Sequence, residues 1–137
     1  MHFCEETPSE LKFIPKLSHT IIDKIKQLPL DEAQIHGVKL SLGEALSNAI
    51  RHGNKLNPDL AVRVKVEAGS RSLTIWVADQ GKGFNFRNAP DPTKPDKLHK
   101  LSGRGIFLIR KHMDKVTFLE RGRKIKMVKL FKKGEGK

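Results

Sequence analysis

The residues best suited to chemistry stand together in one stretch that runs from Leu40 to His52. Within it Glu44, Asn48 and His52 are spaced four apart, so on a helix they share one polar face. A carboxylate one turn away from an amide can orient a water or a hydroxyl beside an Mg²⁺ ion held by oxygen ligands. An amphipathic helix with an ordinary solvated face has the same pattern, so this stretch needs support from elsewhere in the chain.

A second stretch with chemical potential runs from Asp79 to Phe84 and reads Asp-Gln-Gly-Lys-Gly-Phe. Its carboxylate follows an apolar run typical of a buried strand, and it could accept a hydrogen bond from an exocyclic amine such as that of adenine. Gly81 and Gly83 would let the backbone approach a planar ring closely and adopt positive φ. A plain Asp-x-Gly turn is the simpler alternative.

A third stretch, Gly103-Arg104-Gly105, stands directly before a helical pattern. The free N–H groups and the positive dipole end of a helix N-terminus favour a phosphate, which makes these glycines candidates for a phosphate cradle. A loop-to-helix turn without a ligand would have the same sequence. Neither the Walker A pattern nor the dinucleotide-binding fingerprint occurs in the chain.

Length, composition and charge limit what these stretches can belong to. We expect the 137 residues to form one domain, 1–137, with a core that needs no disulfide, and Cys4 is the single cysteine. The net charge of +12 favours an anionic partner, which could be a nucleotide, a nucleic acid or an acidic protein surface. The sequence shows neither a membrane-spanning run nor a signal-peptide pattern, so we expect a cytoplasmic protein that binds no membrane.

Hydrophobic periodicity places the three stretches on elements of an α+β fold. In the first half of the chain we expect a loose end over 1–10, a short edge strand over 10–15, a helix from Ser18 to Pro29 and a helix from Asp31 to Gly53. Strands over 62–67 and 73–78 and a long loop over 85–101 follow. The chain then continues with a helix opened by 102–105, strands over 115–120 and 124–131 with a bulge at Met127-Val128, and a flexible tail over 132–137. Hairpins beside segregated helices favour a two-layer sandwich, with helices on one face of a mainly antiparallel sheet.

Taken in order, the three stretches resemble the N, G1 and G2 boxes of the Bergerat-fold ATPases, the superfamily of gyrase, Hsp90, histidine kinases and MutL. The matching residues read Glu44-Ala-Leu-Ser-Asn48-Ala-Ile-Arg-His52-Gly, Asp79-Gln-Gly81-Lys-Gly83-Phe84 and Gly103-Arg104-Gly105-Ile106. The resemblance covers residues 10–131 and is closest to the anti-sigma factor serine kinase branch. It implies a Bergerat ATP-binding fold with ATP and Mg²⁺ as ligands.

For the first box, the resemblance implies chemistry at the phosphates. Glu44 would be the catalytic general base that takes the proton from the attacking hydroxyl. Asn48 would ligate Mg²⁺ through its amide oxygen, with the metal bridging the ATP phosphates. Arg51 or His52, one turn further along, would support the phosphates or fix the helix face.

For the second box, the resemblance implies recognition of the base. Asp79 would bind the adenine amino group, and Gly81, Gly83 and Phe84 would shape the pocket around the ring. Residues 85–101 would form the ATP lid.

For the third box, Gly103 and Gly105 would give backbone N–H groups to the phosphates, with Arg104 and Ile106 completing the motif. Two features depart from the branch. An arginine often precedes this box, but Leu101 stands there, and Lys100 and Arg104 are the nearest cations. A Gly-Thr pair that supports the adenine site near the last strand is replaced by Lys126-Met127.

The resemblance implies an ATP- and Mg²⁺-dependent protein serine/threonine kinase that regulates transcription as an anti-sigma factor. Its partners would be an anti-anti-sigma-like phosphoacceptor and a sigma factor, and the branch suggests a homodimer. A degenerate partner-switching module without kinase activity is the alternative. A nucleic-acid binder that uses the +12 charge is a third hypothesis, disfavoured because the sequence has no reader motif or aromatic platform.

Overall fold

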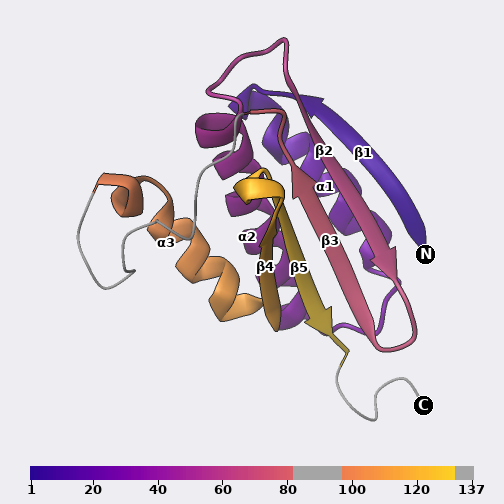
Figure 1. Cartoon of the computed structure of the whole chain (residues 1–137). Coiled ribbons are helices and arrows are strands. Elements are labelled where there is room, and N and C mark those ends of the chain that lie inside the picture. The colour runs from indigo at the N-terminus through magenta and orange to yellow at the C-terminus, as the bar shows by residue number, and fades with distance from the viewer. Residues whose placement is uncertain (82–96, 132–137) are drawn as a thin grey trace.

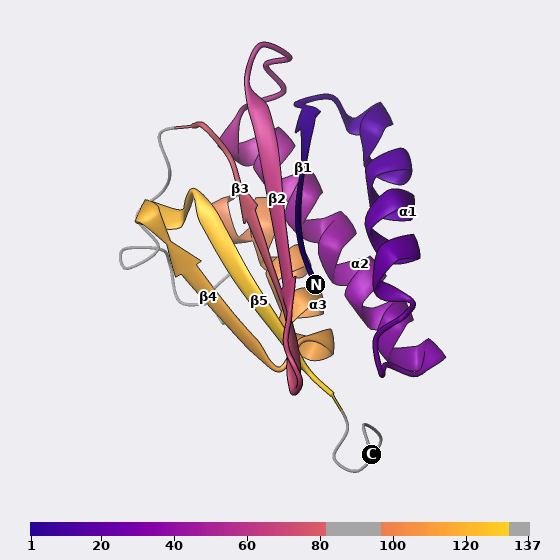
Figure 2. The same cartoon turned by 90° about the vertical axis from the view of Figure 1, so that its right-hand side faces the viewer.

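The computed structural model describes residues 1–81 and 97–131, with the backbone alone for 97–104. In this part of the chain, helices cover one face of a five-stranded antiparallel sheet and leave its other face open (Figure 1; Figure 2). The elements are β1 (His2–Pro8), α1 (Ile14–Ile25), α2 (Glu32–Asn48), β2 (Ala61–Ala68), β3 (Ser72–Ala78), α3 (Lys97–His112), β4 (Lys115–Leu119) and β5 (Lys124–Leu130). The predicted α+β two-layer sandwich is confirmed.

The strands follow the order β1-β2-β3-β5-β4, and each neighbouring pair is antiparallel. β3 is therefore the central strand, as its apolar sequence predicted. It ends at Ala78, so the turn that begins with Asp79 leaves the middle of the sheet. This places the second chemical stretch at the sheet end where α2 also finishes.

The hydrophobic core lies between the sheet and the helices. Alternate residues of β2 and β3 point into it, as the predicted period of two requires. Fully buried side chains come from all of these layers: Val62, Val64, Val66, Leu73, Ile75, Ile21, Ile25, Val38, Leu42, Leu46, Ile109 and Met127. Burying each such side chain contributes roughly 1.5–3 kcal/mol, so α2 is held firmly against the sheet along its length.

The N-terminal residues form a strand rather than the predicted loose end. β1 pairs with β2 from His2 opposite Glu67 to Pro8 opposite Ala61. Simple apolar alternation is missing because polar residues also face α1: the Glu5 carboxylate lies 3.1 Å from Nζ of Lys24. This edge strand therefore depends on contacts with distant segments, which local periodicity does not report.

Helix α1 begins earlier than predicted, and the predicted edge strand over 10–15 is wrong. A 3₁₀ turn at Leu11–Phe13 leads into α1, with Pro15 in the first turn of the helix. Proline suits that position because its missing N–H has no helical partner there. Ser18 is buried within α1 and does not cap it.

Helix α2 begins as predicted but ends differently. The Asp31 side chain accepts a hydrogen bond from the Gln34 N–H at 2.7 Å, and the Gln34 side chain accepts one from the Asp31 N–H at 3.0 Å, which is a capping box. After Asn48 the chain continues as a π-helix over Ala49–Gly53. Helical winding therefore continues to Gly53 as predicted, but its last turn is a π-helix.

Helix α3 starts at Lys97, so Gly103 and Gly105 lie inside it and do not open it as predicted. The predicted closing hairpin is confirmed as β4 and β5, which are joined by a turn with positive φ at Glu120, Arg121 and Gly122. Residues 82–96, which hold most of the predicted lid, and the tail over 132–137 lie outside the described residues.

The predicted bulge at Met127-Val128 is absent, because β5 keeps an unbroken register with both of its neighbours. The apolar alternation slips because an inward position is occupied by Lys129. Its Nζ donates to the His112 carbonyl at 3.0 Å and lies 3.7 Å from the Asp114 carboxylate. In the described residues, no helix combines the length and apolar character needed to cross a bilayer.

Replacement of the α2 cap gives a direct test of this architecture. Asp31→Ala removes one partner of the capping box, so we expect the free energy of unfolding to fall by about 1 kcal/mol. Chemical denaturation measures the change. Asp23→Ala, at an exposed position within α1, is the matched control and should leave stability nearly unchanged. Equal effects of the two substitutions would contradict the capping role.

Candidate functional site

Helix α3 meets the chemical face of α2 at a glycine. Glu44 and Asn48 are half-buried on α2, and Gly105 of α3 faces both. A Cβ at position 105 would lie 2.9 Å from Oε2 of Glu44 and 3.2 Å from Nδ2 of Asn48. The absence of a side chain at this point therefore leaves room for the carboxylate and the amide.

A second close approach joins the end of α2 to the turn after β3. A Cβ at Gly53 would overlap the Asp79 carboxylate, and a Cβ at Gly81 would overlap the Gly53 carbonyl oxygen. The backbone N–H of Gly81 donates to Oδ1 of Asp79 at 2.8 Å. The first and second boxes are thus in direct contact, and Gly53, the last residue of the first box, is part of that contact.

The Asp79 carboxyl is half-buried, and burial raises its pKa above the ordinary value of 3.8. The hydrogen bond from Gly81 and the positive charge of Arg123 oppose this shift but do not cancel it. The backbone N–H of Asp79 donates to the Arg123 carbonyl at 2.8 Å, which ties the turn to the start of β5. A partly desolvated acceptor held in this way is well suited to recognise a hydrogen-bond donor of a ligand.

The remaining predicted residues divide into two groups. Arg51 is exposed and His52 is half-buried, both on the π-helical turn, and Ile106 is half-buried on α3. Gly83 and Phe84 lie outside the described residues, and for Lys100 and Arg104 only the helical backbone is described.

The prediction that Gly103 and Gly105 offer free N–H groups at a helix start is not met in this conformation. Both lie well inside α3, where backbone N–H groups are engaged within the helix.

Sequence reasoning also missed Asn54, which it assigned to an ordinary turn. Its side chain is almost fully buried, at 2% exposure, and it bonds to three separate segments of the chain. Its place directly after the glycine that ends the first box was the one local signal. A buried amide has to satisfy its donors and acceptor, which makes such a position structurally demanding.

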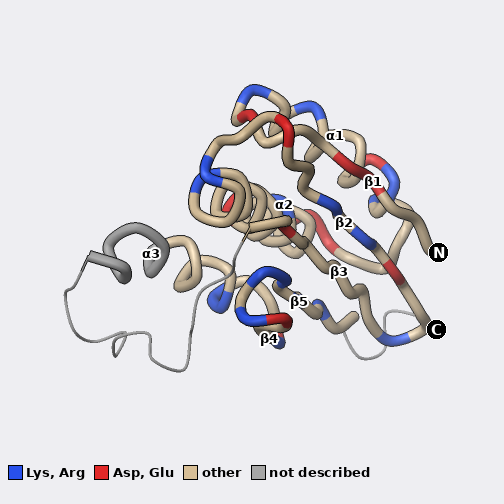
Figure 3. The backbone as a smooth tube through the Cα atoms, turned by 45° about the horizontal axis from the view of Figure 1, so that its top comes forward, with Lys and Arg blue, Asp and Glu red and all other residues tan. Residues whose placement is uncertain are grey.

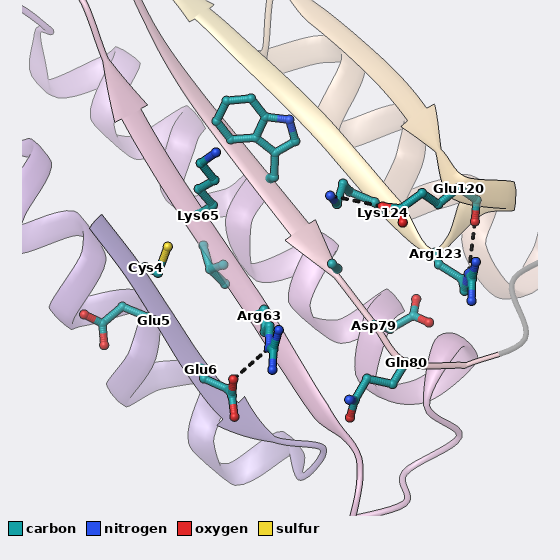
Figure 4. Close-up of a pocket in the computed structure, with 13 residues that line it drawn as sticks. Cys4, Glu5, Glu6, Arg63, Lys65, Asp79, Gln80, Glu120, Arg123 and Lys124 are labelled. Atoms are coloured by element: carbon teal, nitrogen blue, oxygen red, sulfur yellow. Dashed lines mark hydrogen bonds and ion pairs between the residues drawn. The ribbon is translucent and has the colours of Figure 1, made fainter. Parts of the chain in front are cut away.

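A groove of about 800 Å³ lies on the open face of the sheet (Figure 4). Trp76 lies in it, with the ammonium groups of Lys65 and Lys126 at 5.0 and 5.8 Å from its ring centre. The groove reaches Asp79 and Gln80, but Glu44, Asn48 and Gly105 are not part of its lining. It therefore meets the region that joins the boxes only at the turn after β3.

Charge on this groove does not favour a nucleic acid. Its basic lining residues Arg63, Lys65, Arg123 and Lys124 are accompanied by the acidic Glu6, Asp79 and Glu120, whereas the carboxylate of Glu5, which also lines it, pairs with Lys24 of α1. All four of these cations lie within 3.2 Å of a carboxylate or a main-chain acceptor: Arg63 with Glu6, Lys65 with Glu67, Lys124 with Glu120, and Arg123 with the Glu120 carbonyl. Basic segments also occur on several other elements (Figure 3), so the described residues show no single basic track.

The residues that could hold a metal are few. Among the described residues, no three His, Cys, Asp or Glu side chains gather into a metal site. Mg²⁺ typically uses one or two protein oxygens and completes its shell with phosphates and waters. The Asn48 amide oxygen beside the Glu44 carboxylate fits that requirement, and Gly105 leaves both groups uncovered by a side chain at that point.

Comparison with known proteins gives results that agree with this geometry. The family described as the histidine kinase-like ATPase domain matches residues 7–129. A serine-protein kinase RsbW of Staphylococcus epidermidis is 27% identical over 135 residues, covering 92% of this chain and 84% of the relative. A serine-protein kinase RsbW of Staphylococcus aureus (strain MSSA476) is 26% identical over 134 residues, with the same coverage.

The raised pKa of Asp79 predicts a pH-dependent effect on stability. The folded chain binds the Asp79 proton more tightly than the unfolded chain does. The stabilisation that this proton gives the folded state is therefore present at low pH and is lost as the pH rises through the pKa of Asp79 in the folded chain. We expect Asp79→Asn to be more stable than the wild type at pH 7, by no more than about 1 kcal/mol because the group is only half-buried.

This difference should shrink towards zero as the pH falls below 3.8, the ordinary value of the Asp79 pKa. Denaturant unfolding at several pH values measures it, and the exposed Asp59→Asn serves as the control. A stability deficit of Asp79→Asn that grows with rising pH would contradict the assigned direction.

Proposed function

Because the chain belongs to the family of histidine kinase-like ATPase domains, we propose that it binds ATP between α2, α3 and the turn after β3. We further propose that it transfers the terminal phosphoryl group to a serine or threonine hydroxyl of a protein. The observation that carries this proposal is the placement of Gly105 against Glu44 and Asn48. It leaves a carboxylate and an amide together at one point, which is the arrangement that metal-assisted phosphoryl transfer needs.

At the phosphate end, Glu44 takes the proton from the acceptor hydroxyl and Asn48 offers its amide oxygen to Mg²⁺. The metal, when bound, would neutralise part of the negative charge of the phosphates. Both side chains project from one rigid helix whose opposite side is buried in the core, so their separation is set before a ligand arrives. Arg51 and His52 follow on the π-helical turn and support the phosphates in this proposal.

At the base end, Asp79 accepts a hydrogen bond from the adenine amino group. The Gly81 N–H already occupies Oδ1, so the carboxylate is held in orientation and Oδ2 remains the oxygen nearest Gly53. Gly83 and Phe84 complete this pocket in the proposal by their place in the motif.

Residues 85–101, including Lys100, form the lid of the proposed site, and Gly103, Arg104, Gly105 and Ile106 form the phosphate-binding motif that follows it. For Gly103 and Gly105 to donate N–H groups to phosphates, the helix has to begin at or after them, whereas the described α3 begins at Lys97. The proposal therefore includes a shortening of α3 at its N-terminal end when ATP binds.

We propose an anti-sigma role in the cytoplasm on the strength of the motif resemblance and of relatives named serine-protein kinase. The phosphoacceptor would be an anti-anti-sigma-like protein, and a sigma factor and a second copy of this chain would be further partners. A partner-switching module that binds ATP without transferring phosphate is the second candidate. It is favoured by Leu101 and by Lys126-Met127, which stand where the branch carries an arginine and a Gly-Thr pair.

Substitution of the two N-box residues separates these candidates. With labelled ATP, Mg²⁺ and anti-anti-sigma-like proteins as acceptors, we expect Glu44→Ala to lower phosphotransfer by about 100-fold or more while ATP binding is retained. Asn48→Ala should weaken Mg²⁺-dependent ATP binding itself. Wild-type protein that binds ATP but labels no acceptor would favour the module without kinase activity, and wild-type protein that binds no ATP would refute both candidates.

The close approach at Gly105 gives a second test with a matched control. A Cβ there would displace the end of the Glu44 side chain, which can move, so Gly105→Ala should fold normally and lose about 100-fold in phosphotransfer. Gly43→Ala places its Cβ in open space on α2, and should gain up to about 1 kcal/mol of stability with unchanged activity. Equal phosphotransfer by the two variants would refute the role of Gly105.

A further inference from the structure

The turn that carries Asp79 is attached to the rest of the molecule by few backbone bonds. β3 ends at Ala78, which is the last residue of that strand paired with either β2 or β5. Beyond it, the Asp79 N–H reaches the Arg123 carbonyl, and the Gly81 N–H returns to Asp79 itself. Additional contacts therefore decide where the carboxylate points.

Asn54 supplies the main additional contact. It follows the π-helical turn, and its backbone N–H donates to the Ala49 carbonyl at 2.8 Å. Its Oδ1 accepts the N–H of Gln80 at 2.7 Å, directly between Asp79 and Gly81. One side chain thus joins the end of α2 to the middle of the turn.

The other side of the same amide anchors it to the sheet edge. Its Nδ2 donates to Oγ of Ser9 at 2.8 Å and to the Ala61 carbonyl at 3.0 Å. Ser9 in turn donates to the Leu60 carbonyl at 2.7 Å. Both donors and the acceptor of Asn54 are engaged, which is the condition for burying an amide at 2% exposure without a large penalty.

Gln80 closes the network from the opposite direction. Its Oε1 accepts the Ala61 N–H at 2.6 Å, so the residue after Asp79 is held by its backbone to Asn54 and by its side chain to β2. Gly53, the neighbour of Asn54, lies against the Asp79 carboxylate. Movement of Asn54 would therefore displace both Gly53, which contacts the Asp79 carboxylate, and the backbone of Gln80, which follows Asp79.

We propose that Asn54 is a positioning residue that sets nucleotide-base specificity by holding the Asp79 carboxylate in a fixed position relative to the end of α2. This rests on the proposed function, in which Asp79 accepts a hydrogen bond from an adenine amino group. Guanine has a carbonyl at the corresponding ring position, and two acceptors facing each other repel. Discrimination against guanine nucleotides then requires that the Asp79 carboxylate cannot rotate away from the base. A polar group positioned to pair with a donor of one ligand disfavours an analogue that lacks this donor.

The experiment compares ATP and GTP binding by wild type, Asn54→Ala and Asp31→Ala. Asp31→Ala removes the capping box at the start of α2, outside this hydrogen-bond network, so it controls for lost stability. We expect Asn54→Ala to lose about tenfold in ATP affinity and to prefer ATP over GTP about tenfold less than wild type. Asp31→Ala should keep the wild-type preference although it unfolds more easily.

Two further readouts keep the test decisive. Hydrogen exchange at the Gln80 and Gly81 amides without nucleotide should accelerate in Asn54→Ala more than in Asp31→Ala. Where phosphotransfer is measurable, KM for ATP should rise with little change in kcat, because base binding is lost equally in the ground and transition states. If Asn54→Ala does not fold, Gln80→Ala, at an exposed position, removes the bond to Ala61 and should show a smaller loss of preference.

The outcomes separate the two proposals. An unchanged ATP preference in folded Asn54→Ala, or in Gln80→Ala where the first variant is unfolded, overturns the role of the network and leaves the proposed function intact. An equal loss of preference in Asp31→Ala also overturns it, because the effect would then follow from stability alone. Wild-type protein that binds no ATP overturns the proposed function and this inference with it.

Discussion

The close contact of α2 with two neighbours, the Asp79 turn and α3, is the constraint on which the candidate site depends. At Gly53 and Gly81 there is no space for a side chain, and at Gly105 a Cβ would press on Glu44 and Asn48. Because α2 is fixed by fully buried core residues such as Leu42 and Leu46, both contacts are defined relative to one rigid element. The base end and the phosphate end of the proposed site therefore have a set separation.

Polar groups near this contact are arranged so that burial does not leave them unpaired. Asn54 uses all of its side-chain donors and its acceptor, while Asp79 is only half-buried and has one oxygen bonded by Gly81. The π-helical turn links these two features, since it delivers Gly53 and Asn54 together to the turn after β3. Such turns are often found at functional sites, where the wider winding repositions residues that a regular helix would place elsewhere.

Much of this architecture follows from local patterns that are visible in the chain. β2 alternates between apolar and charged residues because one of its faces packs on helices and the other meets solvent, and β3 is more apolar throughout. Asp31 with Gln34 marks the start of α2. The pairing of Glu44 with Asn48 needs nothing beyond helical spacing. These features depend on neighbours within a few residues, so sequence reasoning could predict them.

The amino-acid sequence by itself thus determined the α+β class, the central strands and the motif residues that place the chain in its family. Tertiary structure alone decided the pairing of β1, the π-helical turn and the inward Lys129 that replaces a bulge. It also decided that Asn54 is buried among segments far apart in the chain. The physical reason is the same in each case: the stabilising partner lies many residues away, and only folding brings it within bonding distance.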